Sequence, residues 1–181
     1  MIDAREKIAL FIDGANFYAT NKALGVEVDY RKFLSHYQAQ AYVVRSYYYT
    51  AVQEDAEFTS VRPLIDWLDY NGFTVVTKPT KEYQDREGRN RVRTNMNMEI
   101  AVNALEMAPF YDHAVIFSGN GEFLPLVEAL QRKGKRVTAV STIATDMPMI
   151  ADDLRRQVDF FVDLQDLTKH IGRPVRIAAN A

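Results

Sequence analysis

The chain has 181 residues, 22 basic and 24 acidic side chains, and a formal net charge of −2, so any surface that attracts nucleic acid has to be local. Cysteine is absent, which excludes disulfide bonds and thiolate metal sites and fits a reducing compartment. No apolar run approaches the roughly 20 residues that span a bilayer, so we expect a cytoplasmic protein without a membrane partner.

The first expected element is the most informative one. Residues 8–12 form an apolar run that ends in Asp13 and Gly14. A run of this length, closed by an acid and a glycine, is typical of a buried parallel strand. Open α/β folds place their ligands at the carboxyl ends of such strands. Asp13 is therefore the first candidate for a functional residue.

Strand and helix patterns then alternate along the chain. We expect further strands at 41–51, 73–77, 115–117, 137–140 and 160–162. We expect helices at 16–24, 30–38, 58–70, 97–107, 122–132 and 149–156. This alternation predicts a three-layer α/β/α sandwich around a mainly parallel central sheet. We expect one domain over residues 1–174, followed by a mobile tail at 175–181.

Residues 78–93 interrupt this alternation and predict a β-hairpin excursion. The segment holds six basic side chains against three acidic ones. Its candidates for contact with a phosphate backbone are Lys78, Lys81, Arg89, Arg91 and Arg93. Tyr83 could stack a base beside them. The alternative is a solvated hairpin of mixed charge, and the sequence favours neither.

A second strand tip resembles the first. The apolar run 114–117 leads into Ser118, Gly119, Asn120, Gly121 and Glu122. If these two strands are neighbours at the point where the strand order reverses, Asp13, Asn16, Asn120 and Glu122 meet in one crevice. The structural alternatives are helix caps at Asp13, Asn16 and Asn97, a turn at Asn120, and a helix-dipole preference at Glu122.

With residues 11–16 and 117–123 in place, the chain resembles the NYN domains of the PIN-like nuclease superfamily, in the bacterial LabA-like branch. The resemblance runs from Lys7 to about Pro174 and includes the segments 67–72, 131–134 and 149–156. It implies a metal-dependent ribonuclease fold in which acids at strand tips hold Mg²⁺ or Mn²⁺. The implied substrate is RNA, with single-stranded RNA expected.

The resemblance also assigns site residues. Asp13, Asn120 and Glu122 take the catalytic positions, and Asp13, Glu122 and Asn97 take the metal positions. Asn16, Asn103 and Ser118 join the basic side chains of the hairpin as substrate contacts. Three positions that are acidic in the family pattern are amides here, at Asn97, Asn103 and Asn120.

These amides reduce the negative charge that the family site uses. Two carboxylates, Asp13 and Glu122, with Glu99 nearby, could hold one weakly bound ion but not two at catalytic spacing. A less acidic crevice also repels a phosphate backbone less. Three hypotheses remain open: an RNA-directed nuclease with a weak metal site, an inactive RNA-binding protein, and a protein-interaction module that forms a homodimer.

Overall fold

The computed structural model describes residues 2–52, 61–80, 82–84, 90–92 and 94–173. Its centre is a six-stranded sheet in the order β4-β3-β1-β7-β8-β9, and all five neighbouring pairs run parallel. The strands are β1 (Lys7–Asp13), β3 (Tyr42–Val52), β4 (Thr74–Pro79), β7 (His113–Phe117), β8 (Arg136–Ser141) and β9 (Phe160–Asp163). The expected parallel sheet is confirmed.

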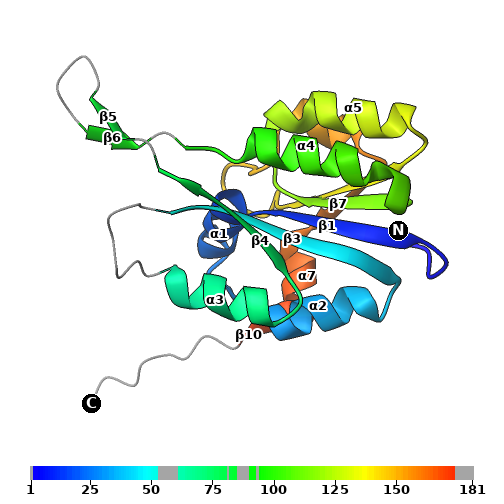
Figure 1. The fold of residues 1–181 in the computed structure, drawn as a ribbon, viewed down its shortest axis with the longest axis horizontal. Coiled ribbons are helices and arrows are strands. Elements are labelled where there is room, and N and C mark those ends of the chain that lie inside the picture. The colour runs from blue at the N-terminus through cyan, green and yellow to red at the C-terminus, as the bar shows by residue number, and fades with distance from the viewer. Residues whose placement is uncertain (1, 53–60, 81, 85–89, 93, 174–181) are drawn as a thin grey trace.

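Helices cover both faces of this sheet, as Figure 1 shows. On one face lie α4 (Asn97–Met107), α5 (Leu124–Arg132) and α6 (Asp152–Gln157). On the other lie α1 (Gly14–Ala23), α2 (Tyr30–Gln38), α3 (Arg62–Tyr70) and α7 (Leu164–Ile171). Short 3₁₀ turns, η1 (Ala108–Phe110) and η2 (Gly121–Phe123), flank β7. The three-layer α/β/α sandwich is confirmed.

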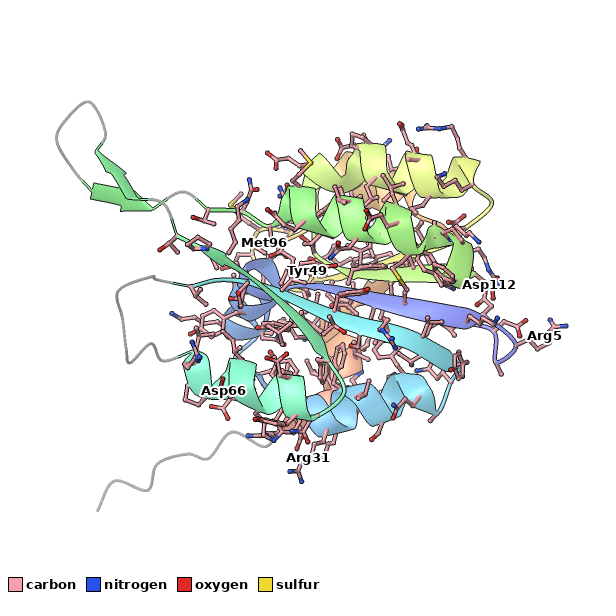
Figure 2. All side chains as sticks on the ribbon, viewed as in Figure 1. Arg5, Arg31, Tyr49, Asp66, Met96 and Asp112 are labelled. Carbon is pink, nitrogen blue, oxygen red and sulfur yellow. The ribbon has the colours of Figure 1, made fainter. Side chains whose placement is uncertain are left out.

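The central strand β1 explains why two layers of helices are needed. Its side chains alternate between two cores, with Ala9 and Phe11 packed toward α4–α6 and Ile8, Leu10 and Ile12 toward α1–α3 and α7. Both faces of the strand are fully buried, which is why its sequence is a continuous apolar run. Figure 2 shows side chains filling the space between the sheet and the helices on both sides.

Several boundaries differ from those expected. The helix expected at 122–132 begins as η2, and α5 starts only at Leu124, with a proline in its first turn. The helix expected at 149–156 starts at Asp152, because the preceding backbone is engaged elsewhere: Met149 N–H donates to Thr142 and Ala151 N–H donates to Gly119. Helix α3 is described from Arg62, and the start expected at 58 lies outside the described residues.

One helix and two short strands of the described residues were not expected. Helix α7 follows β9, and a short strand β2 (Glu27–Val28) pairs antiparallel with β10 (Gly172–Arg173). The mobile tail predicted for 175–181 lies outside the described residues. Within the described residues, no helix combines the length and apolar character needed to cross a membrane.

The hairpin is confirmed in the part of the segment that the structure describes. Strand β5 (Glu82–Gln84) pairs antiparallel with β6 (Asn90–Val92), and Figure 1 shows both extending away from the layered body. Strand β4 continues to Pro79, so the excursion begins later than residue 78.

The strand order places the two predicted tips side by side. Strand β1 pairs with β7, with Ile12 opposite Phe117, and on its other side Asp13 lies opposite Tyr49 of β3. The chain proceeds from β1 to β3 and β4 in one direction and to β7, β8 and β9 in the other. The β1–β7 boundary is therefore a topological switch point, and Asp13 ends the strand that borders it.

One glycine holds the tip of β7 against the segment before α6. A Cβ on Gly119 would lie 1.8 Å from the carbonyl oxygen of Met149, closer than any real contact. The Gly119 carbonyl also accepts a hydrogen bond of 2.9 Å from Ala151 N–H. Only glycine allows this backbone-to-backbone approach.

We expect Gly119→Ala to lower the free energy of unfolding by about 3 kcal/mol, because backbone rather than a flexible side chain has to move. The matched control is Gly25→Ala. Gly25 has a φ of +66° but open space around it, so only backbone strain of about 1 kcal/mol is expected. Urea unfolding of both variants measures the difference, and equal losses would contradict the steric argument.

Candidate functional site

Asp13 ends β1 and is at the same time the N-cap of α1. Its Oδ1 accepts a hydrogen bond of 3.2 Å from Asn16 N–H, and its Oδ2 accepts one of 3.1 Å from the Ser118 hydroxyl. The side chain is buried, and burial raises the pKa of Asp13, while these hydrogen bonds act in the opposite direction. Asp13 therefore caps α1 and also ends a buried strand.

Ser118 and Asn16 join the tips of β1 and β7. The Ser118 hydroxyl donates to Asp13 and accepts from Asn120 N–H at 3.2 Å. Asn16 accepts a hydrogen bond of 3.2 Å from Gly119 N–H through its side-chain oxygen. The sequence predicts that Asp13, Asn16, Asn120 and Glu122 meet. Asp13, Asn16 and Asn120 are joined through Ser118 and Gly119 in one hydrogen-bond network. Glu122 joins it through its backbone N–H, which donates to the Asn120 side chain.

Glu122 is held by two amides. Asn120 is the N-cap of η2 and accepts a hydrogen bond of 3.1 Å from Glu122 N–H. Asn97 donates from its side-chain nitrogen to Glu122 Oε2. Asn97 is the first residue of α4, and the N-cap position belongs to Met96, so the interpretation of Asn97 as a helix cap is wrong. Its amide instead connects α4 to the tip of β7.

Asn103 lies two turns further along α4 and has a different partner. Its side-chain nitrogen donates to the Tyr49 hydroxyl at 3.2 Å. Tyr49 belongs to the core beneath α4–α6, and Figure 2 labels it with Met96 at the same end of the sheet. Asn103 therefore has a structural contact, and its role in substrate binding stays a prediction.

The basic candidates are described only in part. Lys78 forms an ion pair of 2.7 Å with Glu99, which holds the pKa of that carboxyl below its usual range. Lys81, Arg89 and Arg93 lie outside the described residues, and Arg91 is described by its backbone alone, which pairs with Tyr83. The phosphate-contact interpretation of residues 78–93 stays a prediction.

Asp153 is a carboxylate near the site that sequence reasoning did not select. A Cβ on Gly121 would lie 3.4 Å from Asp153 Oδ1, so this carboxylate lies beside the turn that carries Asn120 and Glu122. The sequence shows an acid in the first turn of an expected helix, which the helix dipole explains without any site. Only the packing of α6 against η2 reveals its position.

The donor set is weak for a metal ion. Among the described residues, no three His, Cys, Asp or Glu side chains come together in a way that could hold one. Asp13 and Glu122 remain as anionic ligands, and each is already engaged by neutral donors. One or two carboxylates with waters and substrate phosphates are the usual ligands of Mg²⁺. Asp13 and Glu122 are therefore the residues that would hold an ion at these strand tips, and that role stays a prediction.

The fold and this site define the class. The NYN domain model matches residues 7–165, and the chain belongs to this family. The low amplitude and bright protein LabA from Synechococcus elongatus is 33% identical over 174 residues, which cover 94% of this chain and 90% of that protein. The resemblance to LabA-like NYN domains is confirmed, and the fold is consistent with the PIN-like superfamily.

A solved structure has the same architecture. A protein of unknown function from Vibrio parahaemolyticus, VPA0982, superimposes with a TM-score of 0.73 at 27% sequence identity. The match covers 96% of this chain and 99% of that one, so the whole arrangement of layers is shared.

The raised pKa of Asp13 predicts how the stability of the folded protein depends on pH. The protonated Asp13 carboxyl is favoured in the folded state, so its protonation stabilises the fold. This stabilisation is fully present below the ordinary pKa of 3.8 and is lost as the pH rises through the raised pKa of the folded protein. In Asp13→Asn the amide does not ionise, so this loss of stability with rising pH cannot occur. The amide also keeps a side-chain oxygen that can cap α1.

We therefore expect Asp13→Asn to gain stability relative to the unmodified protein as the pH rises from about 4 to about 7. Urea unfolding of both proteins without divalent ions, at several pH values, measures this trend. A loss of stability in Asp13→Asn that grows with pH would show instead that the ionised carboxylate stabilises the fold.

Proposed function

We propose that this protein acts on RNA through the crevice at the β1–β7 switch point, with a divalent-metal endoribonuclease-type site whose acid cluster is depleted. The observation that carries the proposal is the geometry of the two strand tips. Asp13 and Glu122 extend from neighbouring tips, and amides at Asn97 and Asn120 occupy the positions around Glu122. Membership of the NYN family supports RNA as the substrate class.

Asp13 and Glu122 would hold one Mg²⁺ or Mn²⁺ ion, with the Asn97 and Asn120 oxygens as neutral ligands. When bound, such an ion supplies activation of water and shielding of phosphate charge. Neutral amides add no charge, so the ion is weakly bound and turnover is slow. Mn²⁺ tolerates mixed ligands better than Mg²⁺ and is the favoured ion.

The chain's own residues position the substrate. Ser118 and Asn16 fix the Asp13 carboxylate at the end of its strand, and Asn97 orients Glu122. Fewer negative charges at this edge let a phosphate backbone approach without strong repulsion. The crevice therefore binds RNA even when no ion is present.

A second candidate function is RNA binding or regulation without catalysis. The hydrogen bond between Asn97 and Glu122 favours it, because an amide now satisfies the carboxylate that an ion would otherwise engage. The expected homodimer, the preference for single-stranded RNA and the cytoplasmic location stay predictions.

Cleavage of labelled single-stranded RNA tests the first candidate. We expect slow cleavage with Mn²⁺, less with Mg²⁺ and none with EDTA. Asp13→Asn should reduce the rate by about 100-fold or more, because half of the anionic ligand charge is removed. Equal, background-level rates in both proteins under every metal would exclude the nuclease and leave the binding function.

Restoring an acid tests the metal site without relying on turnover. In Asn97→Asp, two carboxylates replace an amide–carboxylate hydrogen bond, so their repulsion should lower thermal stability in EDTA. We expect Mn²⁺ to reverse that loss and to stabilise Asn97→Asp more than the unmodified protein. Asn103→Asp, which lies beside Tyr49 instead, is the matched control and should show no such Mn²⁺ response.

A further inference from the structure

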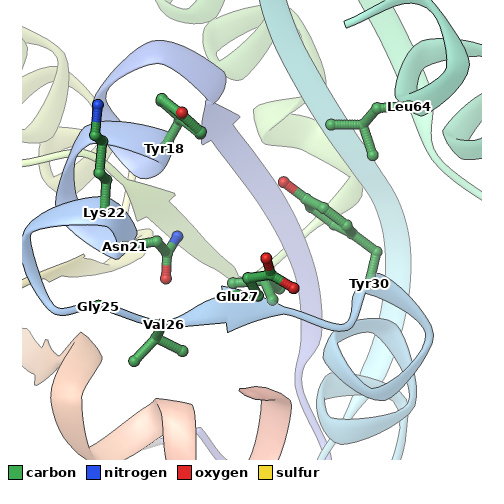
Figure 3. A pocket seen from close by; sticks show the side chains of 9 residues that line it. Tyr18, Asn21, Lys22, Gly25, Val26, Glu27, Tyr30 and Leu64 are labelled. Atoms are coloured by element: carbon green, nitrogen blue, oxygen red, sulfur yellow. The ribbon is translucent and has the colours of Figure 1, made fainter. Parts of the chain in front are cut away.

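A cavity of about 480 Å³ lies beside the candidate site and is not used by it. It is open to solvent and is lined by α1, the turn after it, β2, the start of α2 and one residue of α3, and its volume is within the range of small-molecule sites. Figure 3 shows Tyr18, Lys22, Glu27, Tyr30 and Leu64 around this space.

The walls combine an aromatic surface with one charge of each sign. Tyr18 is 66% exposed, although it follows the buried Phe17 on the same helix. Lys22 lies one turn further on the same face of α1, and Glu27 comes from β2 on another side of the cavity. Within the part of the chain that the structure describes, neither Lys22 nor Glu27 forms an ion pair, so both charges are available to a ligand.

The cavity is connected to the candidate site through two tyrosines. The Tyr30 hydroxyl lies 3.5 Å from that of Tyr48, and the two rings meet edge to face with centroids 5.8 Å apart. Tyr48 in turn packs where a Cβ on Gly14 would lie, directly after Asp13.

This combination fits one nucleotide. An exposed aromatic ring provides a stacking surface for a base, a lysine ammonium attracts a phosphate, and a carboxylate accepts N–H donors from the edge of a base. Guanine presents two adjacent N–H donors on its Watson–Crick edge, which match the two oxygens of Glu27. Uracil presents one N–H between two carbonyls, which a carboxylate repels.

We propose that the cavity between α1, β2 and α3 is a guanine-binding subsite, in which Tyr18 stacks the base, Glu27 accepts from its Watson–Crick edge and Lys22 contacts its phosphate. As a subsite for RNA that crosses the Asp13 crevice, it rests on the proposed function. The same chemistry would accept a free guanine nucleotide, which is the other source of this ligand.

The experiment compares three ligands in EDTA, where cleavage does not interfere. They are a short oligouridine, the same oligomer with one central guanosine, and guanosine monophosphate, each measured by fluorescence anisotropy or by competition. We expect the guanosine-containing RNA to bind more tightly than oligouridine. Glu27→Gln should abolish that preference, and Tyr18→Ala should weaken binding about tenfold.

The control variant is Tyr42→Ala. Tyr42 is 69% exposed, close to the value for Tyr18, but it begins β3 opposite Lys7, at the end of the strands away from Asp13. Its replacement should leave all three affinities unchanged. Because Tyr18, Glu27 and Tyr42 are exposed, none of these substitutions disturbs a core.

The outcomes separate this inference from the proposed function. RNA binding that is unaffected by Tyr18→Ala and Glu27→Gln overturns the subsite and leaves the proposed function standing. Tyr18-dependent binding of guanosine monophosphate without any RNA binding supports the subsite for a free nucleotide and overturns the RNA function. Binding of neither ligand overturns both.

Discussion

The hydrogen bond between Ser118 and Asp13 is the interaction on which the site depends. It joins the ends of two strands that are 105 residues apart in the sequence, and Asn16 adds a second connection to Gly119. Both bonds require β1 and β7 to be neighbours in the parallel sheet. The strand order therefore determines which side chains meet, and the local residues determine only how they are oriented.

The charge balance at the two strand tips follows from the uncharged hydrogen-bond donors that contact the Asp13 and Glu122 carboxylates. Asp13 is buried among donors that carry no formal charge, and its pKa rises because burial outweighs those bonds. Glu122 is held by an amide where a second carboxylate would repel it. This arrangement is stable without an ion, whereas a cluster of four or five carboxylates would need cations to compensate its charge. The amides at Asn97 and Asn120 thus satisfy Glu122 without adding negative charge.

Much of the fold and part of the candidate site could be predicted from the sequence, because the residue patterns that indicate them are local. The continuous apolar run of β1 indicates a strand buried on both faces, and the glycines after α1 and α5 indicate where helices end. Alternation of strands and helices indicates the layers. Asp13 and Ser118 can be identified because each directly follows such a run, and Asn120 because it comes two residues after Ser118.

The other features of the site and the cavity depend on contacts between elements that are far apart in the sequence, and no local pattern predicts such contacts. Asn97 looks like a helix cap, and only the docking of α4 beside η2 gives its amide a carboxylate partner. Asp153 approaches the site because α6 packs against the same turn. The cavity at Tyr18 is formed by four separate elements, and none of its lining residues belongs to the motifs that the sequence analysis selects.

The central position of β1 in the sheet also determines how readily the strand that carries Asp13 opens. Its backbone is paired on both sides, with β3 and with β7, while β4 and β9 form the outer edges. Amide groups in such a strand exchange with solvent only when the whole domain opens, whereas edge strands open locally. Leu10 and Phe11 should thus be among the slowest-exchanging amides of the chain. The hydrogen-bonded tip of β1 is then as persistent as the fold itself.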